Sequence, residues 1–349
     1  VQMTVASARL WNRLGASRLE RSICMAATRC AVRATLGARM SPPYHQVLDS
    51  NLLVFWGHNP VSTAPHLMPY VRRAQRRGCK LVVIDPLRSR SAGNADLYLQ
   101  PLPGTDAALA LAVANEIFTS NRHDRCWLEA HSLGWEKLRR RAAKYPAERA
   151  SQITGIPSRQ IREFAHLFGC VNPAMIRMGD AVNRNLQGGQ TVRAIACLPA
   201  LTGQYGRRGG GLGCSTGDYF QWDDEAVNRW QSCPAPGRVI NMNRLGAALC
   251  GEADDPPIRS LFVFAANPMV SAPNTGRVRE GLLRDDLFTV VHDLFLTDTA
   301  RYADIVLPAT SQLEQVDLHR GYGHTHLARN QPAIAPVSYT HLTLPTITS

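Results

Sequence analysis

Lysine is nearly absent from this chain. Only Lys80, Lys137 and Lys144 occur, so almost all of the 39 basic residues are arginine, and they outnumber 27 acidic residues to give a formal net charge of +12. A strongly basic chain can bind nucleic acid or another polyanion. Here the arginines are spread along the whole sequence and aromatic residues make up only 7%. We therefore favour an anionic cofactor, or simple codon bias, over DNA or RNA as the explanation of the charge.

Long apolar runs are also lacking. No run approaches the ~18 residues of a membrane span, so we expect none. Apolar residues make up 45% and charged residues 19% of 349, which excludes a disordered tail, a collagen-like fibre and a coiled coil. The length suits two domains of ~150 residues each. The sequence starts at Val1 with no leader pattern, and we expect an internal fragment of a longer protein.

Closely spaced cysteine pairs are lacking as well. The nine cysteines include no C-x-x-C pair, which argues against a disulfide framework, a zinc ribbon and a complete iron–sulfur motif within the chain. We expect ordinary thiols of a reducing compartment, which favours the cytoplasm, and export to the periplasm stays open. The cysteines are Cys24, Cys30, Cys79, Cys126, Cys170, Cys197, Cys214, Cys233 and Cys250.

Short apolar runs alternate with helical patterns along most of the chain. The runs predict strands at 52–56, 81–84, 174–178, 261–265, 288–292 and 305–307. Helices are expected within 18–37, over 67–77 and 105–118, throughout 122–169 and over 190–201. In the last helix of 122–169, Ser158 is the expected N-cap and Gly169 the stop. Nearly continuous apolar strands between helices predict an α/β fold with mostly parallel sheets.

The sequence contains an internal repeat. Sliding the chain over itself so that residue 52 falls on residue 260 aligns LLVFWGHNP with SLFVFAANP and needs no gap over 52–106. The identical or similar pairs are Asn59-Pro60 with Asn267-Pro268, Asp85 with Asp293, Ser89 with Thr297, Ser91 with Thr299, Ala95-Asp96 with Ala303-Asp304 and Leu99 with Leu307. Two copies of one α/β unit are therefore expected.

The repeated polar residues follow the predicted strands, where open parallel sheets bind ligands. Asp85 and Asp293 suit hydrogen bonds to a ribose or to the amino and imino groups of a purine. The hydroxyls of Ser89 and Thr297 suit phosphate oxygens. Asn-Pro and Asp-Pro are common turn formers when they occur singly. Here they recur at a constant spacing in both copies of the repeat, which favours a role in ligand binding. The repeat predicts two nucleotide-like groups held across a shared crevice.

Six motifs are used for comparison with known families: WGHNP at 56–60, VVIDPLRSRSAGNAD at 82–96, PGTDAAL at 103–109, VRAIACLPALTG at 192–203, NP at 267–268 and TDTARYADIVLPAT at 297–310. Together they resemble the catalytic subunit of the molybdopterin oxidoreductase family, of the dimethyl-sulfoxide-reductase type, over residues 15–336. The resemblance implies two Rossmann-like units at 1–150 and 151–300 with mostly parallel sheets and a helical connecting segment. Residues 301–336 would be a return segment, and 337–349 a non-native tail.

The resemblance further implies that two molybdopterin guanine dinucleotides clamp one molybdenum ion. The residues matched to the first dinucleotide are Trp56, Gly57, Asn59, Pro60, Asp85, Pro86, Arg88, Ser89, Gly104, Thr105 and Asp106. Those matched to the second are Asn183, Arg184, Gly188, Asn267, His292, Asp293 and Thr297. Cys24 stands at the place of the metal ligand, and a thiolate is a soft ligand. A buried apolar cysteine is the plainer reading of that residue, and Cys30 is the second candidate.

By the same resemblance the protein would be a two-electron oxidoreductase acting on a small-molecule substrate by oxygen-atom transfer or dehydrogenation. A 4Fe-4S cluster is expected in a region outside this chain, and an electron-transfer subunit or a quinone- or ferredoxin-type carrier as partner. Two residues depart from the family pattern: Leu87 replaces a basic residue, and Ala181 replaces a glycine. No histidine follows Cys24 as it does in formate dehydrogenases, so formate is not favoured as substrate.

Two alternative functions are open to this sequence. A molybdenum-free relative of the same fold, as in respiratory complex I, would serve as a structural and electron-wiring subunit. Residues 213–217 match the hydrolase pattern G-x-S-x-G, but a glycine-rich loop precedes them instead of a strand. We therefore do not favour a hydrolase.

Overall fold

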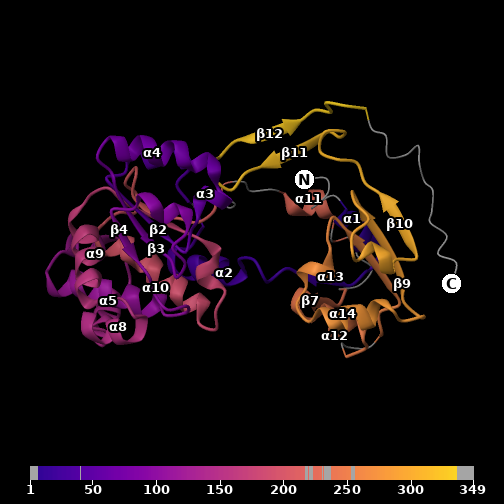
Figure 1. The fold of residues 1–349 in the computed structure, drawn as a ribbon, viewed down its shortest axis with the longest axis horizontal. Coiled ribbons are helices and arrows are strands. Elements are labelled where there is room, and N and C mark those ends of the chain that lie inside the picture. Colours follow the sequence, from indigo (N-terminus) through magenta and orange to yellow (C-terminus); the bar gives the residue numbers. More distant parts are fainter. Residues whose placement is uncertain are drawn as a thin grey trace. The chain divides into compact units, whose positions relative to one another are not determined.

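The computed structural model describes residues 7–335, with gaps at 40, 217–218, 220–222, 230, 232–236 and 253–255. The chain forms two compact units (Figure 1). We call residues 24–221 with 321–325 the large unit, and the remainder the small unit. No helix among the described residues has the length and apolar character that a membrane crossing requires.

A parallel five-stranded sheet forms the centre of the large unit, in the order β4-β3-β2-β5-β6. The strands are β2 (Leu52–Trp56), β3 (Lys80–Ile84), β4 (Leu97–Leu99), β5 (Ala174–Met178) and β6 (Gly211–Gly213). Every residue of β2 and β5 is buried. Such strands need cover on both faces, which explains their nearly continuous apolar sequences.

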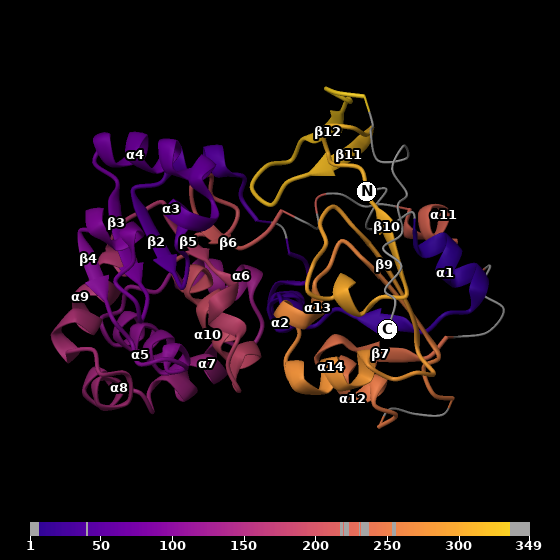
Figure 2. The same ribbon diagram turned by 45° about the vertical axis from the view of Figure 1, so that its right-hand side comes forward.

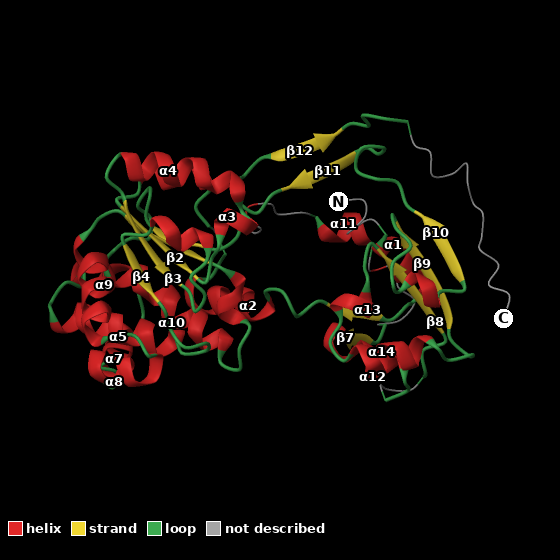
Figure 3. Cartoon of the chain, in the orientation of Figure 1, coloured by secondary structure: helices red, strands yellow, loops and turns green. Residues whose placement is uncertain are grey.

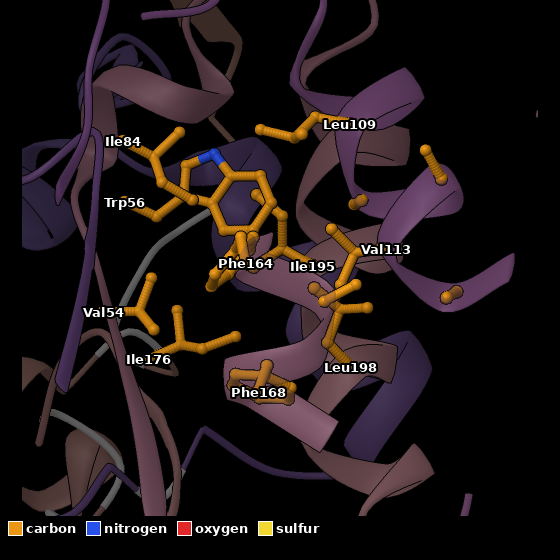
Figure 4. Packing of buried hydrophobic residues seen from close by; sticks show 14 of the residues in the cluster. Val54, Trp56, Ile84, Leu109, Val113, Phe164, Phe168, Ile176, Ile195 and Leu198 are labelled. Atoms are coloured by element: carbon orange, nitrogen blue, oxygen red, sulfur yellow. The ribbon is translucent and has the colours of Figure 1, made fainter. Parts of the chain in front are cut away.

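Helices cover both faces of this sheet (Figure 2). One face carries Leu53, Phe55 and Val83, which pack with Val71 and Ala74 of α4 (Met68–Arg76). The other face packs against α5 (Asp106–Thr119), α9 (Ser158–Cys170) and α10 (Gly188–Leu201). Figure 4 shows this second cluster, with Val54, Trp56, Ile84, Leu109, Val113, Phe164, Phe168, Ile176, Ile195 and Leu198.

The large unit also contains the helices α2 (Ala26–Leu36), α6 (Arg125–His131), α7 (Trp135–Ala142) and α8 (Ala147–Thr154). Two local predictions differ from the structure. Ser158 is the first residue of α9 and Pro157 precedes it as the cap, while the helix continues through Gly169 to Cys170. A Cβ on Gly169 would lie 3.2 Å from Arg122 Cδ, so close packing, and not helix termination, accounts for that glycine.

The small unit contains a second, three-stranded parallel sheet in the order β10-β9-β8 (Figure 3). Its strands are β8 (Ser260–Phe264), β9 (Phe288–Asp293) and β10 (Ile305–Pro308). Helix α12 (Leu245–Leu249) precedes β8, and α13 (Pro268–Ser271) and α14 (Thr275–Leu282) lie between β8 and β9 in the sequence. The parallel pair β1 (Arg18–Glu20) and β7 (Val239–Asn241) and the hairpin β11 (Asp317–Arg320) and β12 (Leu327–Asn330) were not predicted. Helices α1 (Ala8–Leu14) and α11 (Asp224–Asn228) also belong to this unit.

The compact units do not follow the predicted boundaries at residues 150 and 300. Strands β5 and β6 come from beyond residue 150, yet they extend the sheet that β2 begins. The boundary therefore lies near residue 221, and residues 7–23 join the small unit through β1. The predicted tail at 337–349 lies outside the described residues.

The internal repeat is confirmed at the level of backbone geometry. Strand β2 pairs with β3 from Leu52 opposite Lys80, and β8 pairs with β9 from Ser260 opposite Phe288, the corresponding residues. Gly57 has φ +56° and its counterpart Ala265 has φ +49°. Helices α3 (Pro60–Thr63) and α13 then begin one residue after Asn59 and Asn267. The two units thus contain two copies of one α/β arrangement, as the α/β fold prediction required.

Candidate functional site

The order of strands places a reversal of the chain's direction across the sheet at the carboxyl ends of β2 and β5. The chain moves outward from β2 to β3 and β4 and then returns to β5 on the other side of β2. Parallel sheets bind ligands at such a reversal. The two backbones approach closely here, because a Cβ on Gly179 would lie 1.9 Å from Gly57 O and one on Gly57 would lie 2.6 Å from Val182 Cγ2. Glycine is therefore required at both positions.

The repeated asparagines hold the loops of each copy together. In the small unit, Thr299 Oγ1 donates to Asn267 Oδ1 at 2.7 Å and accepts the Met269 N–H at 3.1 Å. In the large unit, Ser91 Oγ donates to Asn59 Oδ1 and accepts the Val61 N–H at 3.2 Å. The asparagine oxygens thus connect the loop after the first strand to the loop after the second. Both residues were predicted to bind cofactor, and the structure uses their oxygens to shape the loops.

We expect Asn59→Ala and Asn267→Ala to destabilise the chain by similar amounts, because each removes the hydrogen bond between the asparagine oxygen and the corresponding hydroxyl, Ser91 or Thr299. A net loss of about 0.5–1.5 kcal/mol is typical of such a hydrogen bond. Urea unfolding of the two variants measures the effect. A large cost for one variant and none for the other would show that the two copies are not energetically equivalent.

The repeated aspartates shape the next loop in the same way. Asp85 Oδ1 accepts the Leu87 N–H at 2.8 Å, and Asp293 Oδ1 accepts the Phe295 N–H at 3.3 Å. Burial raises the pKa of Asp85, and the Leu87 hydrogen bond opposes that rise. The buried Ser89 Oγ has no hydrogen-bond partner among the described residues. A hydroxyl in that position can donate to a ligand oxygen.

A cavity of about 500 Å³ lies beside this loop in the large unit. Predicted residues Pro86 and Arg88 line it together with Tyr98, Gln100 and Gln160. The Arg88 guanidinium carbon lies 5.5 Å from the centre of the Tyr98 ring. The volume falls within the range of about 300–1,000 Å³ typical of small-molecule sites. Two of the predicted residues are therefore placed where a nucleotide-sized group fits.

Trp56 and Asp106 face the core instead of a ligand. Trp56 is fully buried, and its Nε1 donates to Asp106 Oδ1 at 2.8 Å. Burial raises the pKa of Asp106, and the Trp56 hydrogen bond opposes the rise. Asp106 is the first residue of α5, so this bond fixes the loop before it, which contains Gly104 at φ +81° and Thr105. These two side chains therefore position the loop before α5.

The Asp106 carboxyl makes the free energy of unfolding depend on pH, and the direction of its pKa shift gives the sign. Its pKa is raised in the folded state, so folding binds a proton between the unfolded and folded pKa values. That stabilisation is complete below the unfolded pKa and is lost as pH rises through the folded pKa. Asp106→Asn keeps an acceptor for Trp56 Nε1, and we expect it to remove this part of the pH dependence. Urea unfolding between pH 4 and 8 tests this, and an unchanged pH slope contradicts it.

Cys24 lies at the start of α2, and it is exposed. Its carbonyl oxygen accepts a hydrogen bond from Asn183 Nδ2 at 3.3 Å. Asn183 ends the 3₁₀ turn η5 (Asp180–Asn183), which follows β5. A Cβ on Gly188 would lie 1.9 Å from Asn183 O, so the start of α10 packs tightly against that turn. The structure thus brings Cys24, Asn183 and Gly188 together.

The residues predicted for the second dinucleotide are divided between the units. Asn183, Arg184 and Gly188 belong to the large unit. Asn267, His292, Asp293 and Thr297 belong to the small unit, at the carboxyl ends of β8 and β9 and in the loops that follow. Thr297 Oγ1 accepts the Ala300 N–H at 3.2 Å, which leaves its proton for another acceptor. No group of three or more histidine, cysteine or acidic side chains suited to a metal ion occurs among the described residues.

Two residues at this edge were not predicted: His58, which is half-buried, and Arg177, which is buried. His58 follows Gly57, and burial with the nearby charge of Arg177 lowers its pKa to about 3. Arg177 in β5 is 2% exposed, donates from Nη1 to Pro42 O at 3.0 Å and lies 5.0 Å from the Tyr44 ring centre. The motif WGHNP could have indicated His58. Nothing in the apolar run 174–178 marks its single arginine as buried.

Comparison with known proteins agrees with this arrangement. The model of the molybdopterin oxidoreductase family matches residues 1–337. The chain is 41% identical over 327 residues to the probable oxidoreductase YoaE of Bacillus subtilis, covering 93% of this chain and 48% of that protein. It is 31% identical to the alpha subunit of an F420-dependent formate dehydrogenase of Methanocaldococcus jannaschii, covering 77% and 42%.

A solved structure, acetylene hydratase from Pelobacter acetylenicus, has a TM-score of 0.78 and 26% identity over 95% of this chain and 51% of that one. The chain spans about half the length of the relatives that it matches. The family model covers nearly all of this chain. The motifs that resemble the family contain residues that follow the strands of the duplicated α/β unit. This chain therefore belongs to the molybdopterin oxidoreductase family.

Proposed function

We propose that this chain is the cofactor-binding half of a molybdenum-dependent oxidoreductase that moves two electrons to or from a small substrate. The observation that carries the proposal is the duplicated loop system, in which Asn59 with Asp85 and Asn267 with Asp293 adopt matching hydrogen-bonded geometry. The same loop geometry at both strand ends supports the binding of two similar groups, one at each copy.

The cofactor would be a molybdenum ion held by two molybdopterin guanine dinucleotides. The residues of this chain fit that group in three respects. Asp85 has one carboxylate oxygen engaged by the backbone, so the other can accept from guanine N–H groups. The buried Ser89 hydroxyl lacks a partner among the described residues and can donate to phosphate. Cys24 offers a sulfur atom, and Asn183 Nδ2 donates to its carbonyl oxygen.

When bound, the molybdenum group would supply the two-electron chemistry itself. The chain's own residues would bind and orient it: Asp85 and Asp293 through the two guanines, Ser89 and Thr297 through phosphates, and Cys24 through the metal. His58, kept neutral by burial, can accept or donate a hydrogen bond but adds no charge. A 4Fe-4S cluster and an electron-transfer partner would be supplied by parts of the protein outside this chain.

A structural subunit without molybdenum is the second candidate, and it predicts a different metal content. The intact protein, produced with molybdate in excess, should contain molybdenum as measured by plasma mass spectrometry. Its absence under those conditions would favour the structural subunit and contradict the proposal. A sample grown with tungstate in place of molybdate serves as the control, since the same site should then carry tungsten.

A further inference from the structure

Helix α7 of the large unit presents a strongly cationic side to the solvent. Between residues 132 and 149 the chain has six lysines and arginines but only two carboxylates. Ala142 is fully buried and Leu138 packs against the same core cluster, so the opposite side of the helix faces water. Exposed cations spaced three and four residues apart occupy that side, and one more follows in the next turn. We call these residues the α7 face: Lys137, Arg140, Arg141 and Lys144.

The positive charge of the α7 face is not neutralised by the described part of the chain. None of its carboxylates lies within ion-pair distance of the four cations, and Glu148 pairs with Arg162 instead. Arg149 adds a further cation, since its guanidinium carbon lies 5.2 Å from the centre of the Tyr145 ring and that of Arg141 lies 5.8 Å from it. The face therefore attracts anions.

A fully exposed leucine stands next to these cations. Leu133 lies in the turn between α6 and α7, directly before Gly134, which has φ +77°. The turn is held by the Ser132 hydroxyl, which donates to Leu128 O at 2.7 Å. The Lys137 side chain lies against it, because a Cβ on Gly134 would be 3.8 Å from Lys137 Cδ. The structure thus holds an aliphatic side chain in water, where transfer to an apolar phase is favourable.

The aromatic rings near the α7 face are engaged within the protein. Trp135 stacks on Phe118 with ring centres 6.3 Å apart, and Tyr145 contacts two guanidinium groups. Single-stranded nucleic acid binds through exposed rings on which its bases stack, so this surface does not favour it. An acidic protein would have to supply a pocket for Leu133. The surface of a bilayer offers negative charge and apolar chains together.

We propose that the α7 face and Leu133 attach this protein to the surface of a membrane that contains anionic lipids. The cations would lie at the lipid phosphates, and Leu133 would enter the outer part of the apolar layer. Each cation near an anionic bilayer contributes a factor of about five to binding, and an apolar side chain adds to that attraction. This attachment goes beyond the proposed function, and it requires no bound cofactor.

The test is co-sedimentation of the intact protein with vesicles of phosphatidylcholine, either alone or mixed equally with phosphatidylglycerol. At low salt the protein should pellet with the mixed vesicles only. Raising NaCl to about 0.5 M should release most of it, because salt screens the charges. Lys137→Gln combined with Lys144→Gln removes two cations and should weaken binding about 25-fold. Leu133→Ser should weaken it about 10-fold.

The matched control is Arg72→Gln combined with Arg76→Gln on α4, which removes the same charge from exposed positions. Helix α4 covers the other face of the sheet (Figure 2), so a membrane bound at the α7 face would not reach it. The control should stay within about 3-fold of the wild type, since distant exposed charges are screened. Leu133→Trp should bind as the wild type does, and its added indole emission should shift to shorter wavelength on the mixed vesicles.

Failure of the wild type to bind the mixed vesicles, or unchanged binding in both α7-face variants, would overturn the proposal. An equal loss in the α4 control would show that net charge alone drives binding, which also overturns it. Binding to single-stranded DNA without binding to vesicles would do the same. If Leu133→Ser loses its circular dichroism signal, Leu133→Trp decides, and an unshifted emission contradicts insertion. None of these measurements uses molybdenum or turnover, so the proposed function can fail while the attachment holds.

Discussion

Cys24→Ala in the intact protein should lose more than ~100-fold in turnover while keeping its fold. Residues that only support a metal ligand already cost ~10- to 100-fold when they are replaced, so loss of the ligand itself should cost more. The side chain is exposed, and no cavity opens in the core when it is shortened, so the thermal unfolding midpoint should hardly change. Turnover with a dye electron carrier and circular dichroism measure the two effects.

Cys30→Ala is the matched control, because Cys30 is also exposed and lies in α2, which begins shortly after Cys24. It should keep wild-type turnover. Full turnover in Cys24→Ala together with a loss in Cys30→Ala would transfer the role to Cys30. Full turnover in both variants would remove the thiol ligand from the mechanism.

Asp85→Ala and Asp293→Ala should each lower the amount of cofactor that copurifies with the intact protein. Each carboxylate would accept charge-assisted hydrogen bonds from one guanine, and such bonds contribute about 1.5–3 kcal/mol, or roughly 10- to 100-fold in affinity. Since the two residues hold equivalent loops, the losses should be similar. Molybdenum and guanine content per protein measure them.

Glu129→Ala is the control for these variants, since Glu129 is an exposed carboxylate of α6 that pairs with Arg125. Its removal should leave the cofactor content unchanged. Normal guanine content in both aspartate variants would exclude the strand-end loops as guanine sites. A loss in only one variant would mean that a single copy of the repeat binds the nucleotide.

The repeat was the part of the fold most readily predicted from sequence, because its residues are fixed by local geometry. Asn59 and Asn267 each accept a hydrogen bond from a hydroxyl and each precede a short helix that begins at the next residue, a proline. Strands β2 and β5 were equally clear, since burial on both faces requires an apolar run.

The domain boundary and the role of Trp56 could not be predicted, because both depend on contacts between distant segments. The sequence does not reveal that β5 returns to pair with β2. It also does not reveal that Asp106, in a motif matched to the cofactor, turns inward to the Trp56 indole. Arg39 and Arg177 belong to the same class, since only the tertiary structure buries them.

The number of guanine nucleotides released per molybdenum tests the account most directly. Mild acid hydrolysis of the intact protein should release two GMP for each molybdenum ion, one from each copy of the duplicated loop system. One GMP per metal, or none, would contradict the account, because the second set of strand-end residues would then have no ligand.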